Sequence, residues 1–60
     1  MSIEEIKRNK PDGALRYDVV DGVVWYFKYN DIGLTLINKG SYWQLCVPDV
    51  KHDIEQYKPL

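Results

Sequence analysis

The sequence predicts a small α+β domain, mainly β, with a short N-terminal helix, a four-stranded antiparallel meander and a C-terminal turn or short helix. β-branched and aromatic residues flank Asp21-Gly22 over residues 15–29, which is a strong hairpin signal. Alternating apolar residues flank Lys39-Gly40 in the same way. Because the 60-residue chain contains no repeat, low-complexity segment or linker, we expect residues 1–60 to form a single domain.

The N-terminal segment has the pattern of a short helix. Ser2 and Glu5 fit a capping box, with Ser2 as the N-cap and Glu5 at the third helical position. Ile3 and Ile6 then fall on one face of the helix. Pro11 stops the helix, because proline cannot donate the backbone hydrogen bond that a helix interior needs.

The first hairpin can close in two registers, which bring different side chains together. A two-residue loop, Asp21-Gly22, places Trp25 and Phe27 on a face that also holds charged residues. A three-residue loop that begins at Val20, with Gly22 in the left-handed conformation as a bulge, gathers the large apolar side chains on the other face. Because burial of one large apolar side chain is worth about 1.5–3 kcal/mol, we predict the bulged register.

A second hairpin is predicted from strands at residues 34–36 and 42–47. With Lys39-Gly40 as its loop, Leu36 pairs with Trp43, and the apolar residues again coincide on one face. The predicted core face therefore comprises Trp25, Phe27, Leu34, Leu36, Trp43 and Leu45.

The C-terminal segment leaves two alternatives open. Val50, Ile54 and Tyr57 recur at helical spacing, and Asp49 is placed to cap a short helix. The other alternative is a single turn followed by an extended stretch over residues 54–57 along an edge strand. We favour the turn or short helix, which must pack on the sheet because it is too short to be stable alone.

Composition bounds the class of protein. Eight basic and nine acidic residues give a net charge of −1, which argues against a dedicated polyanion binder and against an acidic nucleic-acid mimic. The single cysteine, Cys46, excludes an internal disulfide and fits a reducing cytoplasm. No apolar run is long enough for a signal peptide or a membrane span. We therefore expect a cytoplasmic protein without a membrane partner.

The sequence contains no pattern typical of catalysis or metal binding. Its only histidine, His52, lies near Asp49, Asp53 and Glu55 without a second histidine or cysteine at ligand spacing, and we interpret it as exposed helix polarity. Glycine-rich phosphate loops, nucleophile elbows and cysteine clusters are also absent. We predict a protein that is not an enzyme, with no catalytic residue, metal or other cofactor.

The predicted register leaves an outer sheet face that is partly apolar. Its candidate interaction residues are Arg16, Val24, Tyr26, Lys28, Ile37 and Tyr42. Exposed apolar patches mark interfaces, and tyrosine is enriched in interface cores, so we predict binding to a protein partner. A second copy of the chain, which would form a homodimer, is one such partner. The alternative hypothesis is weak binding of single-stranded nucleic acid, with bases stacked on tyrosine between basic residues. The protein-binding hypothesis fails if the N-terminal helix or the tail folds back over this face.

Short motifs along the chain resemble a group of short, mostly uncharacterised bacteriophage and prophage proteins. The matching residues are Pro11, Gly13, Ala14 and Tyr17, then Tyr26-Phe27-Lys28, Trp43 and Lys58-Pro59-Leu60. Where that group commonly has Thr-His, this chain has Leu15-Arg16, so any role of that histidine is lost here. The resemblance implies a phage or prophage origin and a bacterial or infected host cell, where we expect a host factor as the target. It implies no known activity and no catalytic or binding residue.

Overall fold

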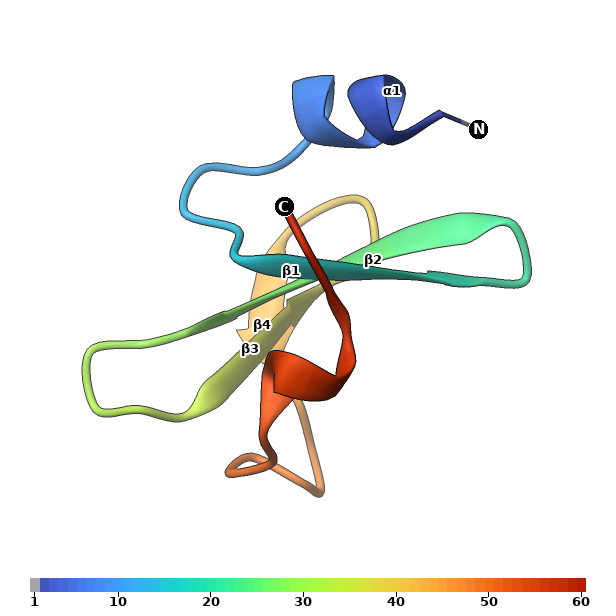
Figure 1. Ribbon diagram of the computed structural model, residues 1–60. Helices are drawn as coiled ribbons and strands as arrows, with labels where there is room; N and C mark the ends of the chain where they lie inside the picture. Colours follow the sequence, from blue (N-terminus) through green and yellow to red (C-terminus); the bar gives the residue numbers. More distant parts are fainter. Residues whose placement is uncertain (1) are drawn as a thin grey trace.

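The computed structural model describes residues 2–60, which form one antiparallel sheet with a short helix against it (Figure 1). The elements in chain order are α1 (Ile3–Arg8), β1 (Arg16–Val20), β2 (Val23–Tyr29), β3 (Thr35–Asn38), β4 (Trp43–Leu45), the 3₁₀ turn η1 (Ile54–Gln56) and β5 (Lys58–Pro59). The strand order is β4-β3-β2-β1-β5. The predicted helix and the meander β1 to β4 are confirmed, and β5 adds a fifth strand beside β1.

Helix α1 begins where the sequence predicted. The backbone N–H of Glu5 donates to the Ser2 hydroxyl at 3.2 Å, which confirms Ser2 as the N-cap. Ile6 is buried against the sheet, whereas Ile3 is 44% exposed, so only one of the two isoleucines anchors the helix. The Tyr26 hydroxyl donates to the Ile6 carbonyl at 2.8 Å and fixes the helix on β2.

The register of the first hairpin differs from the prediction. Val20 pairs with Val23, so the loop is the two-residue Asp21-Gly22, and the predicted bulged register is wrong. Asp21 and Gly22 have φ angles of 51° and 78°, which are the left-handed conformations that a type I′ turn requires. This turn matches the twist of the strands. It pairs Tyr17 with Tyr26, so Trp25 and Phe27 lie on the face opposite Tyr17.

The bulged register was predicted because it gathers the large apolar side chains on a single buried face. Both faces of the sheet are buried, so that reason does not apply. On the face covered by α1, the core consists of Ile6, Ala14, Tyr17 and Tyr26, with Val24, Trp43 and Leu60 packed against it. On the face covered by η1, it consists of Phe27, Ile37 and Ile54, with Trp25, Cys46 and Tyr57 packed against it. The predicted single core face is therefore wrong: Trp25 and Phe27 lie on the η1 side, and Leu36, Trp43 and Leu45 lie on the α1 side.

The second hairpin is longer than predicted. Trp43 pairs with Asn38 and Leu45 pairs with Leu36, so residues 39–42 form the connection and the predicted pairing of Leu36 with Trp43 is wrong. The Asn38 side chain accepts a hydrogen bond from the Gly40 N–H at 2.8 Å, which shapes the wider turn. Because the register shifts by an even number of residues, Leu36, Trp43 and Leu45 still share a face.

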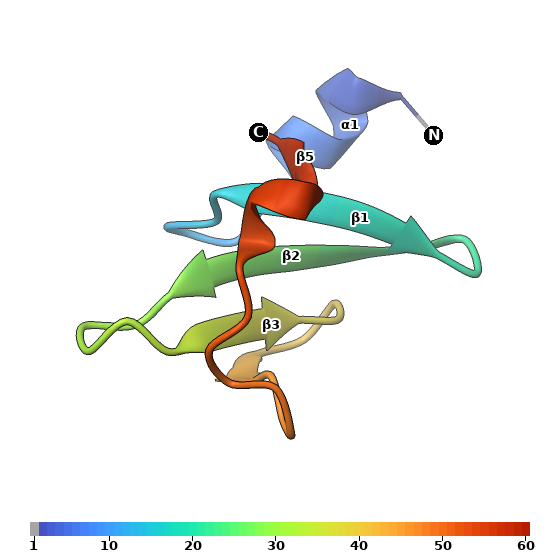
Figure 2. The same ribbon diagram turned by 60° about the horizontal axis from the view of Figure 1, so that its bottom comes forward.

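After β4 the chain crosses the η1 side of the sheet and returns to β1 (Figure 2). Thr35, which is fully buried, holds this segment: its N–H donates to the Val50 carbonyl at 2.7 Å and its hydroxyl donates to the His52 carbonyl at 2.8 Å. The cap of the final turn is Asp53, which accepts from the Glu55 N–H at 2.9 Å, and not Asp49 as predicted. The tail thus contains the predicted turn, followed by an extended edge segment that starts at Lys58.

Candidate interaction surfaces

The six candidate interaction residues do not share one exposed face, so that prediction is wrong. Val24, Tyr26 and Lys28 lie on the α1 side, Arg16 and Ile37 lie on the η1 side, and Tyr42 lies in the connection before β4. Tyr26 and Ile37 are each only 6% exposed. The one-residue shift of the β1–β2 register moves Arg16 to the face opposite Val24, Tyr26 and Lys28, because a slip of one residue exchanges the two faces of a strand. Ile37 lies on the same face as Arg16 because it pairs with Phe27.

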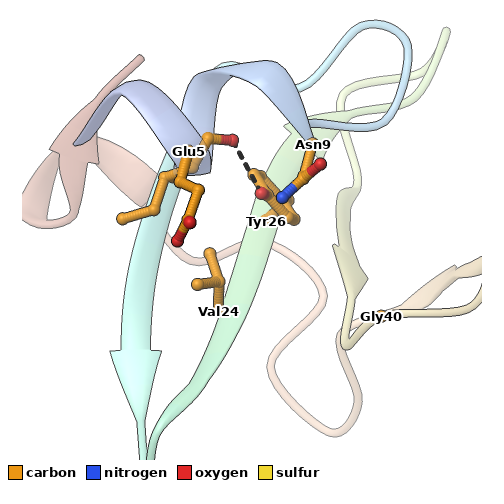
Figure 3. A pocket seen from close by; sticks show the side chains of 6 residues that line it. Glu5, Asn9, Val24, Tyr26 and Gly40 are labelled. Atoms are coloured by element: carbon orange, nitrogen blue, oxygen red, sulfur yellow. Dashed lines mark hydrogen bonds between the residues drawn. The ribbon is translucent and has the colours of Figure 1, made fainter. Parts of the chain in front are cut away.

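Tyr26 forms the floor of a shallow groove between α1 and the sheet. Figure 3 shows this groove, which has a volume of about 240 Å³ and is lined by Glu5, Ile6, Asn9, Val24, Tyr26 and Gly40. Burial raises the pKa of the Tyr26 hydroxyl, whose hydrogen bond goes to the helix. Tyr26 therefore supports α1 and does not present an open ring for stacking.

The two basic candidates contact other parts of the protein on opposite faces. The Lys28 ammonium lies 4.5 Å from the centroid of the Trp43 ring, a cation–π contact on the α1 side. On the η1 side, the Arg16 guanidinium donates to the Tyr57 carbonyl at 3.4 Å. Because the sheet separates these cations, they do not form one basic track along a nucleic-acid backbone.

Exposed apolar side chains gather at β4, the outermost strand of the sheet. Tyr42, Leu45 and Val47, which we call the β4 flank, are 65%, 44% and 71% exposed. Sequence reasoning found Tyr42 but assigned Leu45 to the core and did not select Val47. The alternation of residues 42–47 and the proline that follows could have indicated an edge strand.

The outer edge of β4 is partly open for hydrogen bonding, since the Leu45 carbonyl accepts from the Val47 N–H at 3.0 Å. The backbone N–H of Cys46 donates to the Thr35 carbonyl at 3.0 Å, so the backbone N–H and C=O groups of the even-numbered residues here point toward β3. In an antiparallel ladder the backbone groups of the intervening residues, Trp43 and Leu45, then point away from β3. Within residues 2–60 the N–H groups of these two residues have no backbone partner.

Comparisons of the chain with models of known protein families, with curated proteins and with solved structures found no match. Over residues 2–60, no helix is long and apolar enough to cross a membrane. The candidate function of this chain is therefore argued from its geometry.

His52 is packed inside the protein, and its interpretation as exposed helix polarity is wrong. Its side chain is 13% exposed, and Nδ1 lies 2.8 Å from the Asp49 carbonyl oxygen. The ring stands edge-on to Phe27 and Tyr57, with centroid separations of 6.4 and 6.0 Å. Burial raises the pKa of the nearby Cys46 thiol, and the Asp49 carboxylate raises it further. The described residues contain no group of three or more His, Cys, Asp or Glu side chains placed to hold a metal ion.

Proposed function

We propose that this protein acts by binding another protein through the β4 flank, without a catalytic step of its own. The observation that supports this proposal is that Tyr42, Leu45 and Val47, all well exposed, lie in or next to an outermost strand whose Trp43 and Leu45 N–H groups have no backbone partner. Apolar surface that water contacts is costly, and natural sheets usually blunt or cover their edges. Together, the side chains and the edge favour a partner that adds a strand and buries the apolar group.

The resemblance to phage and prophage proteins supports a host-cell factor as the target. Binding of single-stranded nucleic acid has less support, because Arg16 and Lys28 lie on opposite faces and the net charge is −1. Nucleic-acid binding by this chain would require a surface other than the one formed by these residues.

The proposal is tested by two substitutions in the β4 flank and one matched control. We expect Tyr42→Asp and Leu45→Asp to abolish capture of a protein partner, because each places a charge in a contact that excludes water. Val19→Asp is the control: Val19 is 45% exposed, close to Leu45 at 44%, but lies on β1, away from β4 in the sheet. The measurement is affinity capture from bacterial lysate, followed by titration of the purified partner and circular dichroism of each variant. If all three variants lost partner binding equally, the result would contradict the proposal.

A further inference from the structure

We infer that the groove between α1 and the sheet binds an alkyl chain that ends in an ammonium group, the chemistry of a lysine side chain or of a free alkylamine. Its volume of about 240 Å³ is below the roughly 300–1,000 Å³ of clefts that hold drug-sized ligands, so the ligand is small. The inference goes beyond the proposed function and does not depend on it, because a different surface carries it.

The groove combines an apolar wall with a polar rim. Val24 of β2 is half-buried, and the buried Ile6 and Tyr26 continue the apolar surface. Glu5 and Asn9 of α1 are exposed, and their side chains reach from the helix over β2 (Figure 3). A ligand that fits both parts places methylene groups against Val24 and a polar end at the helix.

The formal charge at the rim is negative. Of the described residues that line the groove, Glu5 alone is charged. Within residues 2–60 it forms no ion pair, although Arg8 follows it by three residues on the same helix. A carboxylate beside apolar surface favours a cation whose stem covers that surface, as the side chain of lysine does.

The lysines of the neighbouring elements leave the groove free for such a cation. The Lys28 ammonium, the only charge on β2, lies over an indole ring at 4.5 Å. The Lys39 ammonium lies over the other indole ring, on the η1 side of the sheet, at 4.6 Å. Lys7 is about 200° around the helix from Glu5. None of these three lysines lines the groove.

The spacing of the two helix residues favours an ammonium over a guanidinium. Glu5 and Asn9 are four residues apart, which places their Cβ atoms about 6 Å from each other on one flank of α1. One nitrogen can therefore lie within hydrogen-bond distance, about 3 Å, of an oxygen atom from each side chain. An ammonium has three donors that can point to both, whereas the planar guanidinium fork matches a single carboxylate.

The first experiment titrates the full chain with n-pentylamine hydrochloride and follows the backbone amides by ¹H–¹⁵N NMR. We expect saturable shifts concentrated at Asn9, Val24 and Gly40, which line the groove. Because so small a ligand makes few contacts, the expected dissociation constant is about 1–10 mM. Pentan-1-ol has the same chain without the charge and should bind severalfold more weakly. Potassium chloride at equal concentration corrects for ionic strength.

The second experiment removes the charge at the rim. Glu5→Gln keeps the length of the side chain and its compatibility with the helix start, and we expect the dissociation constant for pentylamine to rise severalfold. Glu4→Gln is the matched control: it makes the same charge change in the same turn of α1, but Glu4 does not line the groove. This variant should bind pentylamine as the parent protein does. Circular dichroism checks the fold of both variants.

A third titration distinguishes the two sources of the ammonium group. N-acetyl-lysine methylamide carries the same chain on a peptide unit. Binding at least as tight as that of pentylamine would assign the groove to a lysine side chain of another protein. Binding that is much weaker would assign it to a free alkylamine.

The outcomes are independent of the β4 flank. Saturable binding at the groove that Glu5→Gln weakens and Glu4→Gln does not supports the inference. The inference is overturned if no amide shift saturates, if the shifts lie outside the groove, if pentan-1-ol binds as tightly as pentylamine, or if the two variants behave alike. Partner capture by the β4 flank is tested separately by Leu45→Asp, so either idea can fail without the other.

Discussion

At the scale of single residues, Tyr26 shows how one side chain connects two elements. It is 6% exposed, and its hydroxyl donates to the Ile6 carbonyl of α1 from the middle of β2. A buried hydroxyl without a hydrogen-bond partner lowers the free energy of unfolding, so the bond to the Ile6 carbonyl offsets the cost of burying the Tyr26 hydroxyl. Sequence reasoning placed Tyr26 on an exposed face, but its ring and hydroxyl hold the helix against the sheet.

This burial makes stability sensitive to alkaline pH. The folded protein raises the pKa of Tyr26 above its ordinary value of about 10, and burial raises that of Tyr57 as well. Their contribution to stability is fully present below pH 10 and is lost as the pH rises through the folded pKa values, because the unfolded chain ionises first. We expect the free energy of unfolding from urea titrations to fall above about pH 10.

Tyr26→Phe tests two effects of the hydroxyl: its hydrogen bond to Ile6 and its ionisation at alkaline pH. We expect this variant to be less stable at neutral pH, because the Ile6 carbonyl loses its donor, and to lose less stability above about pH 10. A variant with the same alkaline slope as the parent protein would show that Tyr26 does not contribute to it.

At the scale of elements, the first hairpin is determined by its turn. A type I′ turn has the hand of twist that two antiparallel strands need, whereas a bulge adds a residue and a local bend. Asp21 adopts a φ of 51°, a conformation that aspartate and asparagine tolerate because their short polar side chains can bond locally. The turn therefore sets the register, and the register sets which side chains each face receives.

Asp21→Val tests the importance of this turn. A β-branched residue with positive φ is strained, and we expect a loss of about 1–2 kcal/mol in the free energy of unfolding. Asp21→Asn, which tolerates the same conformation, should be close to neutral. If both variants unfolded at the same urea concentration, the turn conformation would not control the stability of the hairpin.

At the scale of the whole molecule, the two ends of the chain cover opposite faces of one sheet. Helix α1 covers Tyr17 and Tyr26, and the segment around Ile54 and Tyr57 covers Phe27. The rings of Phe27 and Tyr57 stack with centroids 4.0 Å apart. A chain this short has little core to divide, so each cluster is small and the two depend on the sheet between them.

Ile54→Ala tests whether the two clusters unfold together. Ile54 is 2% exposed, and its truncation should cost about 2–5 kcal/mol, because it leaves a cavity on the η1 side. Trp43 packs against the cluster on the α1 side, so its fluorescence in a Trp25→Phe background reports the other face. We expect that signal to move to lower urea concentration by the same amount as circular dichroism. A Trp43 transition that did not move would show two independent units.

The sequence by itself determined the local features of this protein. Four features depend on residues close together in the chain: the Ser2 cap, the helix that ends before Pro11, the turn at Asp21-Gly22 and the positions of four strands. Capping, turn conformation and alternating polarity act over only a few residues, and so the sequence contains the information for them. Tyr42 was predicted as exposed on the outer face of a strand over residues 42–47; it is exposed, but it lies in the connection before β4.

Only the tertiary structure decided the pairing of β3 with β2, the burial of both faces and the place of the β4 flank. Alternating polarity predicts a register only if one face is buried, and here the two ends of the chain bury both. Which end covers which face depends on contacts between distant residues, such as the hydrogen bond from the Thr35 hydroxyl to the His52 carbonyl. Leu45 is exposed for the same reason: it lies in an outermost strand, beyond the reach of α1 and η1, and no local pattern contains that information.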